Sequence, residues 1–307
     1  MKETDYVVLL GDANVDVVLE IDAMPLPGAD ALARSQTIGV GGSAANTAIM
    51  LHRLGLHAEL VCCLGQDPWG EMAIDDLQTE GVGLQGLQRC TDHPTSINAV
   101  TVTPDHERTM FAHRGASAHL SPDQLDEQLI TSAAVLYLSG YALLAEPQKS
   151  AALRATALAK HAGIPCVLDV PVPAVEQART ALMDLIPQIE LLVIGSNEAQ
   201  LFTGTSDERS CIAALHEAGA KTVALKLGKA GAVFATRHEW VAVAGIPVRA
   251  SDTTGAGDSF VAGAIFGLVQ GWSLNEIGQW ANKCGAAAVQ KTGAGCSLPS
   301  RSDVYRI

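Results

Sequence analysis

The sequence predicts an α/β fold in which a doubly wound, mostly parallel sheet is flanked by helices. Short aliphatic runs alternate with longer helical segments through most of the 307 residues, as in consecutive βαβ units. Hydrophobic residues make up 48% of the chain but aromatic residues only 4%, which suits strands buried on both faces by Ala, Val, Leu and Ile. Two early stretches, about 14–40 and 96–113, do not fit βαβ units. We expect them to form a small β-sheet lid on a single domain that spans residues 1–307.

Aliphatic runs bounded by turn residues mark the strands of the large sheet. The first run, 6–10, ends at Gly11, and the later runs are similar in length and composition. The last two runs are close enough in sequence to form a hairpin. In chain order, the expected strands are 6–10, 59–64, 134–138, 165–170, 191–194, 222–227, 232–235 and 239–243.

Helices are expected between these strands, and several of them are followed by glycine. Gly55, Gly81 and Gly163 stand where a helix commonly ends in the left-handed conformation. The expected helices are 43–54, 69–80, 147–162, 175–186, 206–218, 256–270 and 274–291. In the lid, residues 14–21 form one expected strand, and 96–103 and 108–113 form a hairpin joined by 104–107.

Composition argues against several classes of function. The formal net charge is −13 and there is no run of Lys or Arg, so we expect no binding to nucleic acid. No apolar stretch approaches the length of a membrane span or a signal segment. The seven cysteines contain no C-x-x-C pair, which is typical of reduced thiols in a cytoplasmic protein.

The strongest chemical signal is the run from Ser251 to Phe260. Its small residues, Gly255, Ala256 and Gly257, open a helix, and backbone N–H groups at a helix N-terminus bind anions. The next residue, Asp258, would repel an anion unless it accepts a proton from a hydroxyl that attacks a phosphoryl group. The alternative is that Asp258 only caps the helix.

This run resembles the C-terminal signature of the ribokinase-like (PfkB) carbohydrate kinases. A second signature of that family is matched by residues 39–48, GVGGSAANTA, and residues 11–16, GDANVD, also fit. The order and spacing of these motifs agree along nearly the whole chain. The resemblance implies an ATP-dependent kinase that transfers the γ-phosphate of MgATP to a hydroxyl of a monosaccharide or sugar derivative, of the ribose, fructose or sugar-acid type.

The resemblance also implies roles for individual residues. Asp258 would be the catalytic base, with the amides of Gly255, Ala256 and Gly257 around the γ-phosphate. Arg114 matches a position where some relatives contact the substrate, and it would suit a sugar acid or a many-hydroxyl ketose; otherwise it is a solvated charge of the lid. The residues expected to bind substrate hydroxyls are Asn14, Asp16, Gly41, Gly42 and Asn46, whose polar groups suit a polyol.

Further positions are implied for the nucleotide and for cations. Glu198 matches the family's acid near Mg²⁺, but Gly195 replaces the usual Asn, so Ser196 or Asn197 would have to supply that oxygen. The residues expected to bind ATP are Lys226, Gly228, Gly231 and Asn282, although such a loop can be a simple turn and Asn282 a surface residue. The residues expected at a monovalent cation, K⁺, are Asp252, Thr254 and Ser297.

Several alternatives remain open. A nucleoside kinase of the same fold is less favoured, because Phe111 and Tyr141 do not form a clear aromatic sandwich for a base. A non-catalytic sugar sensor is favoured only by Gly195. A dinucleotide-binding oxidoreductase is suggested by a G-x-G-x-x-A pattern from Gly39, but about 28 residues separate it from the first strand. A P-loop kinase is excluded because the G-x-x-x-x-G-K-[ST] motif is missing. The resemblance also implies a homodimer in which lid strands pair.

Overall fold

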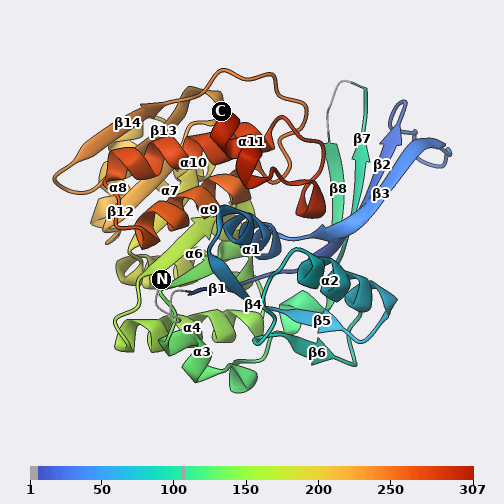
Figure 1. Ribbon diagram of the computed structural model, residues 1–307, viewed down its shortest axis with the longest axis horizontal. Coiled ribbons are helices and arrows are strands. Elements are labelled where there is room, and N and C mark those ends of the chain that lie inside the picture. Colours follow the sequence, from blue (N-terminus) through green and yellow to red (C-terminus); the bar gives the residue numbers. More distant parts are fainter. Residues whose placement is uncertain (1–5, 105–107) are drawn as a thin grey trace.

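A computed structural model describes residues 6–104 and 108–307 (Figure 1). Its large sheet has eight strands in the order β14-β13-β12-β11-β10-β9-β1-β4. The six strands from β12 to β4 are parallel, and β13 and β14 add an antiparallel hairpin. The strands are β1 Tyr6–Leu10, β4 His57–Val61, β9 Val135–Ser139, β10 Cys166–Val170, β11 Leu191–Gly195, β12 Thr222–Lys226, β13 Gly231–Ala235 and β14 Trp240–Ala244.

Helices cover both faces of this sheet, and the strands alternate between two apolar cores. In β1, Val7 and Leu9 face one core, whereas Val8 and Leu10 face the other. The first core includes helices α1 Ser43–Leu54, α2 Pro68–Thr79, α9 Ala256–Val269, α10 Leu274–Ala288 and α11 Arg301–Arg306. The second includes α3 Glu127–Thr131, α4 Gln148–His161, α5 Val172–Gln177, α6 Arg179–Leu185, α7 Ser196–Thr203 and α8 Glu208–Glu217. The predicted doubly wound sheet is confirmed.

A separate four-stranded sheet, here called the small sheet, stands away from the body of the molecule (Figure 1). Its order is β3-β2-β7-β8, with strands β2 Asn14–Ile21, β3 Ala33–Gly41, β7 Ile97–Val102 and β8 Arg108–His113. Both stretches that did not fit βαβ units therefore contribute to it. Residues 105–107 of the predicted hairpin turn lie outside the described residues. Large apolar side chains, Leu26, Leu32, Met110 and Phe111, are exposed on the small sheet and its connections.

Three expected elements differ from the structure. The expected strand 59–64 is two strands, because β4 ends at Val61 and β5 Cys63–Gly65 leaves the large sheet to pair with β6 Gln88–Cys90. The expected helix 175–186 is divided into α5 and α6 at Ala178, which has an irregular φ of −126°. The stretch before α1, for which no separate strand was predicted, forms strand β3. At Cys62 and at Ala178 the apolar pattern continues through the break, so it does not mark the end of either element.

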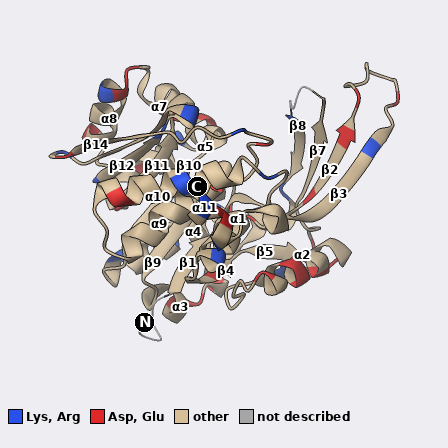
Figure 2. Ribbon diagram, turned by 45° about the horizontal axis from the view of Figure 1, so that its top comes forward, with Lys and Arg blue, Asp and Glu red and all other residues tan. Residues whose placement is uncertain are grey.

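Charged residues are distributed over the surface without a basic face in the view of Figure 2, where Lys and Arg appear as separate segments and α2 carries several acidic residues. None of the helices in the described part of the chain has both the length and the hydropathy needed to cross a membrane.

Candidate active site

Polar side chains gather at the carboxyl edge of the parallel strands. The strand order reverses between β1 and β9, since the chain passes from β1 to β4 on one side and from β9 to β12 on the other. In open α/β sheets, ligands bind outside the carboxyl ends of the strands at such a reversal. The polar residues that end or closely follow β1, β9, β10, β11 and β12 are Asp12, Tyr141, Asp169, Glu198 and Lys226.

Helix α9 begins at this edge and carries Asp258 in its first turn. Its N-cap, Gly255, has a φ of 72°, a conformation that glycine adopts without strain. One carboxylate oxygen of Asp258 accepts a hydrogen bond from Ser43 Oγ (2.9 Å) and the other from Asn46 Nδ2 (2.8 Å). Ser43 and Asn46 lie in the first turn of α1. Two helix N-termini therefore meet at this carboxylate and fix its orientation.

The surroundings of Asp258 suit a base that works near neutral pH. Burial raises the pKa of Asp258 from 3.8 to about 6. The negative charge of Asp169 adds to this rise in pKa, whereas the hydrogen bonds from Asn46 and Ser43 and the Lys226 ammonium oppose it. The carboxylate is therefore ionised above about pH 6, and it can still accept a proton from a hydroxyl.

Free backbone amides lie beside Asp258. Within the described residues, the N–H groups of Gly255, Gly257 and Asp258 have no protein acceptor, whereas the N–H of Ala256 donates to Thr253 O (3.2 Å). The sequence predicted an anion site from the amides of residues 255–257. The structure presents two of those three amides and adds that of Asp258 itself, which is the donor set expected for a phosphate at a helix N-terminus.

Glu198 lies in the first turn of α7. This helix begins directly after Gly195, the last residue of β11. A Cβ on residue 195 would overlap Oε2 of Glu198, so this carboxylate fills space that a larger residue would take. No hydrogen-bond donor among the described residues contacts the Glu198 carboxylate. It is therefore free to bind Mg²⁺ or its waters. Ser196 and Asn197, the expected substitutes for the missing Asn, are exposed.

On the small-sheet side, Asp16 is the central polar residue. Its Oδ1 accepts a hydrogen bond from Asn98 Nδ2 (2.8 Å) on the neighbouring strand. Burial raises the pKa of Asp16, although Asn98 and the Arg108 guanidinium lower it in part. Gly41 faces Asp16, and a Cβ there would overlap the carboxylate. Asn14 pairs with Gly41 across β2 and β3, so these predicted residues lie together.

Arg114 lies in a buried polar network near the end of β1. Its Nη2 donates to both oxygens of Asp12 (3.0 and 3.1 Å) and to Gln148 Oε1 (2.5 Å), while Gln148 Nε2 donates to Asp12 Oδ1 (2.7 Å). The Nε and Nη1 atoms of Arg114 are buried without a hydrogen-bond partner in the described residues. The guanidinium thus has its charge balanced by Asp12 and keeps two donors for a ligand.

Asn46 has both ends of its amide engaged by the protein. Nδ2 donates to Asp258, and Oδ1 accepts from Gly295 N (2.9 Å). Gly42, at the N-cap of the same helix, packs on the backbone of Asp12, so a Cβ there would overlap its carbonyl oxygen. The structure assigns the Asn46 amide to holding Asp258, and a contact of Asn46 with a sugar hydroxyl stays a prediction.

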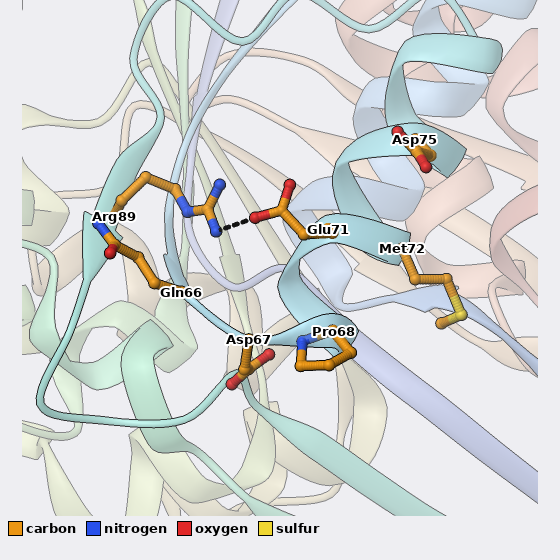
Figure 3. Close-up of a pocket in the computed structure, with 7 residues that line it drawn as sticks. All are labelled: Gln66, Asp67, Pro68, Glu71, Met72, Asp75 and Arg89. Carbon is orange, nitrogen blue, oxygen red and sulfur yellow. Dashed lines mark hydrogen bonds and ion pairs between the residues drawn. The ribbon is translucent and has the colours of Figure 1, made fainter.

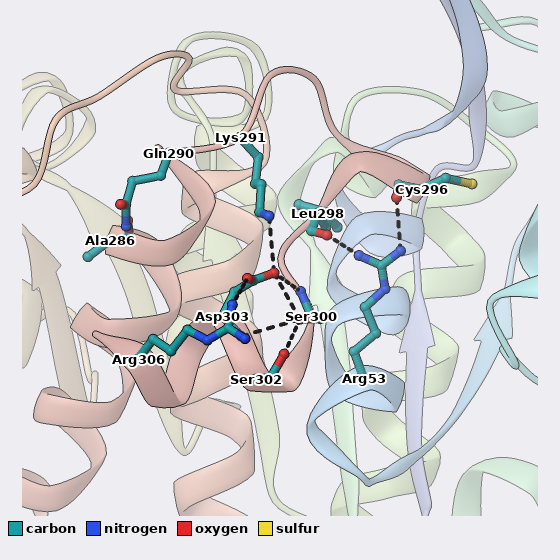
Figure 4. Close-up of polar contacts among 10 residues, drawn as sticks. All are labelled: Arg53, Ala286, Gln290, Lys291, Cys296, Leu298, Ser300, Ser302, Asp303 and Arg306. Atoms are coloured by element: carbon teal, nitrogen blue, oxygen red, sulfur yellow. Dashed lines mark hydrogen bonds and ion pairs between the residues drawn. The ribbon is translucent and has the colours of Figure 1, made fainter.

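The loop that contains Gly295 is fastened on two sides (Figure 4). The guanidinium of Arg53 on α1 donates to the carbonyl oxygens of Leu298 and Cys296. The Lys291 ammonium pairs with Asp303 of α11 (3.1 Å). These contacts hold the segment after α10 against the last turn of α1 and against α11.

The three residues expected at a monovalent cation lie close together. Asp252 Oδ1 accepts hydrogen bonds from the N–H and hydroxyl of Thr254 (2.9 and 2.7 Å), and its Oδ2 accepts from Gly293 N (2.8 Å). Ser297 Oγ lies 3.4 Å from the position that a Cβ on Gly293 would take. Asp252 therefore joins the loop before α9 to the loop after α10, and its carboxylate oxygens are already largely used by protein donors.

The four residues expected to bind ATP do not lie in equivalent places. Lys226, at the end of β12, lies beside the start of α9. Gly228 is in an open turn, with no atom near the position of a Cβ. Gly231 packs on β14, where a Cβ would overlap Val243 O, and Asn282 Nδ2 donates to the carbonyl oxygens of Val243 (3.3 Å) and Ala244 (3.1 Å). The structure thus brings only Lys226 to the anion site.

Several polar residues of the site were not singled out from the sequence. Tyr137, fully buried on β9, has its hydroxyl 3.1 Å from Ser43 Oγ and extends the network around Asp258. Asp169 contacts Lys226, and Gln148 and Asn98 complete the networks described above. Asp169 and Tyr137 lie near the carboxyl ends of predicted strands, and Asp12 and Tyr141 closely follow such ends. That position was the signal that could have identified them.

A hollow of about 760 Å³ lies elsewhere, between the start of α2 and strand β6 (Figure 3). Three of its charged groups are engaged with the protein: Arg89 pairs with Glu71 (2.5 Å), and Asp67 caps α2 through Gly70 N and accepts two hydrogen bonds from Thr95. We assign no ligand to it.

Comparisons with known proteins agree with this geometry. The profile described as "pfkB family carbohydrate kinase" matches residues 4–301. Fructokinase-1 of Oryza sativa subsp. japonica is 33% identical over 319 residues, which cover 99% of this chain and 98% of that protein. The structure of Arabidopsis thaliana ribokinase complexed with ribose and ATP is 26% identical, covers 98% of both chains and has a TM-score of 0.84. Adenosine kinase from Sinorhizobium meliloti is also 26% identical, covers 99% of both chains and has a TM-score of 0.88. The predicted ribokinase-like fold is confirmed, and the chain belongs to the pfkB family of carbohydrate kinases.

Proposed function

We propose that this sugar kinase transfers the γ-phosphate of MgATP to a hydroxyl of a neutral monosaccharide, with Asp258 as the base. The observation that carries the proposal is the position of the Asp258 carboxylate, which two helix N-termini hold beside the free amides of α9. A carboxylate next to an anion site is unfavourable in a purely structural role. It is useful where a hydroxyl must lose a proton as it attacks a phosphoryl group.

In the proposed reaction, the acceptor hydroxyl donates its proton to Asp258 while its oxygen forms a bond to the γ-phosphorus. The bond from that phosphorus to the bridging oxygen breaks, and ADP leaves with the electron pair. The amides of Gly255, Gly257 and Asp258 stabilise the charge on the phosphoryl oxygens. Mg²⁺, when bound with ATP, neutralises phosphate charge, and the free Glu198 carboxylate is the group that would hold it or its waters.

The network around Arg114 supports a neutral acceptor rather than a sugar acid. Asp12 already balances the guanidinium charge, and Asp16 and Asp258 are further carboxylates of the proposed site. An anionic sugar would be repelled there, whereas the N–H groups on the two unpaired nitrogens of Arg114, Nε and Nη1, suit hydroxyl oxygens. The fructokinase and ribokinase relatives support ketoses and pentoses as the first acceptors to test.

A nucleoside acceptor receives less support, although an adenosine kinase is among the similar structures. Phe111 is exposed on the edge strand β8, and Tyr141 is placed among carboxylates near Asp12 and Asp258. The two rings therefore do not form a pair around one base.

We also propose that the small sheet acts as a lid on the domain and that it pairs with a second copy of the chain. Arg108, at the start of β8, donates to Thr254 Oγ1 (2.6 Å) and so links the small sheet to the loop before α9. The edge strands of the small sheet are β3 and β8, and Leu32 and Phe111 are exposed. These features support the proposal that another chain covers the small sheet. Closure over the sugar would exclude water, a competing acceptor.

Two further expectations remain proposals. The cluster of Asp252, Thr254 and Ser297 supports activation by K⁺, which predicts higher turnover in potassium chloride than in choline chloride of equal ionic strength; equal turnover would contradict it. All seven cysteines are free thiols, which supports a cytoplasmic location. Fractionation that placed the protein in an oxidising compartment would contradict that location.

The test of the proposed function is ADP release from MgATP with a panel of neutral pentoses, hexoses and ketoses, sugar acids and nucleosides, with Asp258→Asn as the control. Turnover with a neutral sugar that is lost in the variant supports the proposal. Turnover only with a sugar acid overturns the neutral acceptor, and turnover only with nucleosides overturns the sugar acceptor. Binding of sugars without any turnover would favour a sensor.

A further inference from the structure

An ion pair joins two strands at the edge where α9 begins. Asp169 is on β10 and Lys226 is at the end of β12, with β11 between them. Lys226 Nζ lies 2.8 Å from Asp169 Oδ1, and both side chains are mostly buried. The pair therefore passes over the end of β11, where Gly195 has no side chain to separate the two groups.

The ammonium of this pair lies beside the anion site. Lys226 Nζ is 3.7 Å from the position that a Cβ on Gly257 would take. A cation at a helix N-terminus is repelled by the partial positive charge of the helix. Burial alone would lower the pKa of Lys226, but Asp169 and then the more distant Asp258 and Glu198 raise it. The protein thus keeps a positive charge at a place where it is unfavourable unless an anion is bound.

The hydrogen-bonding capacity of Lys226 fits a bound phosphoryl group. An ammonium has three N–H donors, and Asp169 is the one residue among those described that accepts a hydrogen bond from it. The remaining donors lie near the amide of Gly257 and the carboxylate of Asp258. An oxygen of a phosphoryl group held by the α9 amides would be within their reach.

Asp169 also limits what Lys226 can contact. Without Asp169, the nearest anionic partners of the ammonium would be Asp258 and Glu198. An ion pair between Lys226 and Asp258 would neutralise the base and occupy the place of the acceptor hydroxyl. Asp169 therefore holds the ammonium next to the phosphoryl position but away from the base.

On the basis of the proposed function, we propose that Lys226 is a catalytic residue that donates hydrogen bonds to the transferring phosphoryl group. We propose in addition that Asp169 is a positioning residue that holds Lys226 for this contact. Charge on the phosphoryl oxygens is redistributed during transfer, and a fixed donor that is already in place stabilises it. The effect should therefore fall on kcat more than on the KM of the sugar.

The test compares Lys226→Met, Lys226→Arg and Asp169→Asn with a matched control pair. Lys221, just before β12, forms an exposed ion pair with Glu190 (2.9 Å), so Lys221→Met and Glu190→Gln remove a similar pair far from the anion site. We expect kcat to fall ~100-fold for Lys226→Met, as for loss of one donor to transition-state charge, and ~10-fold for Asp169→Asn, with partial recovery in Lys226→Arg. The control variants should retain wild-type kcat.

The pH profile separates this role from a structural one. The charged or titratable groups that face Asp258 are Asp169, Lys226, Tyr137 and Tyr141. Since the Lys226 charge lowers the pKa of Asp258 and the Asp169 charge raises it, the acid limb of kcat/KM should move to higher pH in Lys226→Met and to lower pH in Asp169→Asn. General loosening of the site would not shift the two variants in opposite directions.

Clear outcomes overturn the inference. If Lys226→Met raises the KM of ATP and leaves kcat unchanged, Lys226 binds only the ground state of the nucleotide. If both variants move the acid limb in the same direction, Asp169 does not position Lys226. Because breaking a buried pair can destabilise the fold, the double variant, which removes both charges, is measured as well, and folding is checked by circular dichroism. A folded double variant with wild-type kcat also overturns the inference. Lack of turnover in the wild-type protein would instead count against the proposed function.

Discussion

Replacement of Asp258 by Asn should remove turnover and stabilise the fold at the same time. The pKa of Asp258 rises from 3.8 to about 6, first because of burial. Each unit corresponds to about 1.4 kcal/mol, so the ionised carboxylate destabilises the folded state by about 3 kcal/mol at pH 7.5. Asn has nearly the same shape and no charge, and it can accept the hydrogen bond from Asn46. The variant should therefore be more stable by about this amount.

The sign of the pH dependence follows from the raised pKa. The folded protein binds the proton of Asp258 more tightly than the unfolded chain, so this group contributes stability below about pH 4 that is lost as the pH rises through about 6. The stability difference between variant and wild type should fall to about 1 kcal/mol at pH 4.5 and vanish at lower pH. Urea denaturation at pH 7.5 and 4.5 measures it.

Activity and stability are measured on the same preparations. Turnover of Asp258→Asn should fall at least ~100-fold, the usual range for loss of a general base, and kcat/KM of the wild type should decline below about pH 6. Asp252→Asn is the matched control. Although burial alone would raise the pKa of Asp252, the hydrogen bonds from Gly293 and Thr254 lower it, so this change should destabilise the protein at pH 7.5. A less stable Asp258→Asn variant, or near-normal turnover, would refute the reasoning.

Other predictions concern the metal, the sugar and the assembly. Glu198→Gln should raise the Mg²⁺ concentration needed for half-maximal rate more than the KM of the sugar, and the reverse pattern would count against Glu198 as the metal residue. Gly41→Ala should lower kcat/KM for the sugar ~100-fold because the methyl group displaces the Asp16 carboxylate. Gly39→Ala on the same face of β3 has free space and should have little effect; equal losses would contradict the explanation. Sedimentation at micromolar concentration should show a dimer, and a monomer alone would exclude pairing through the small sheet.

Most of the large sheet could be predicted because its strands are short aliphatic runs with helices between them. β1, β2 and α1 have the expected bounds. The division between β4 and β5 at Cys62 could not be predicted, because Cys62 is as apolar and as buried as its neighbours. The chain turns there so that β5 can pair with β6. Pairing with a segment that is distant in sequence leaves no local signal. The same holds for β3, whose residues 34–37 are exposed and polar and are ordered by pairing with β2.

The candidate site shows a similar division. Asp258 and the glycines beside it stand in one continuous motif, so the sequence predicts them as a unit. Asp169 and Lys226 are 57 residues apart. The resemblance placed Lys226 in a loop at ATP, but Asp169 lies in no motif that was recognised. Their contact depends on the order of β10, β11 and β12 in the sheet, which sequence patterns do not specify. In the sequence, Gly195 replaces the Asn that the family usually has near Mg²⁺. In the structure, its lack of a side chain leaves room for the Glu198 carboxylate.

Asn46 illustrates how one amide can serve a role that its motif does not reveal. The resemblance predicts contact with a sugar hydroxyl, yet Nδ2 binds Asp258 and Oδ1 binds Gly295 N, 212 and 249 residues away in the chain. Asp at this position would place two carboxylates together, and Leu would leave an oxygen of Asp258 without a donor. The Asn46 amide provides the donor at one end and the acceptor at the other. Because the segment around Gly295 also carries Ser297 of the expected cation site, a shift of that segment would be transmitted through Asn46 to the base.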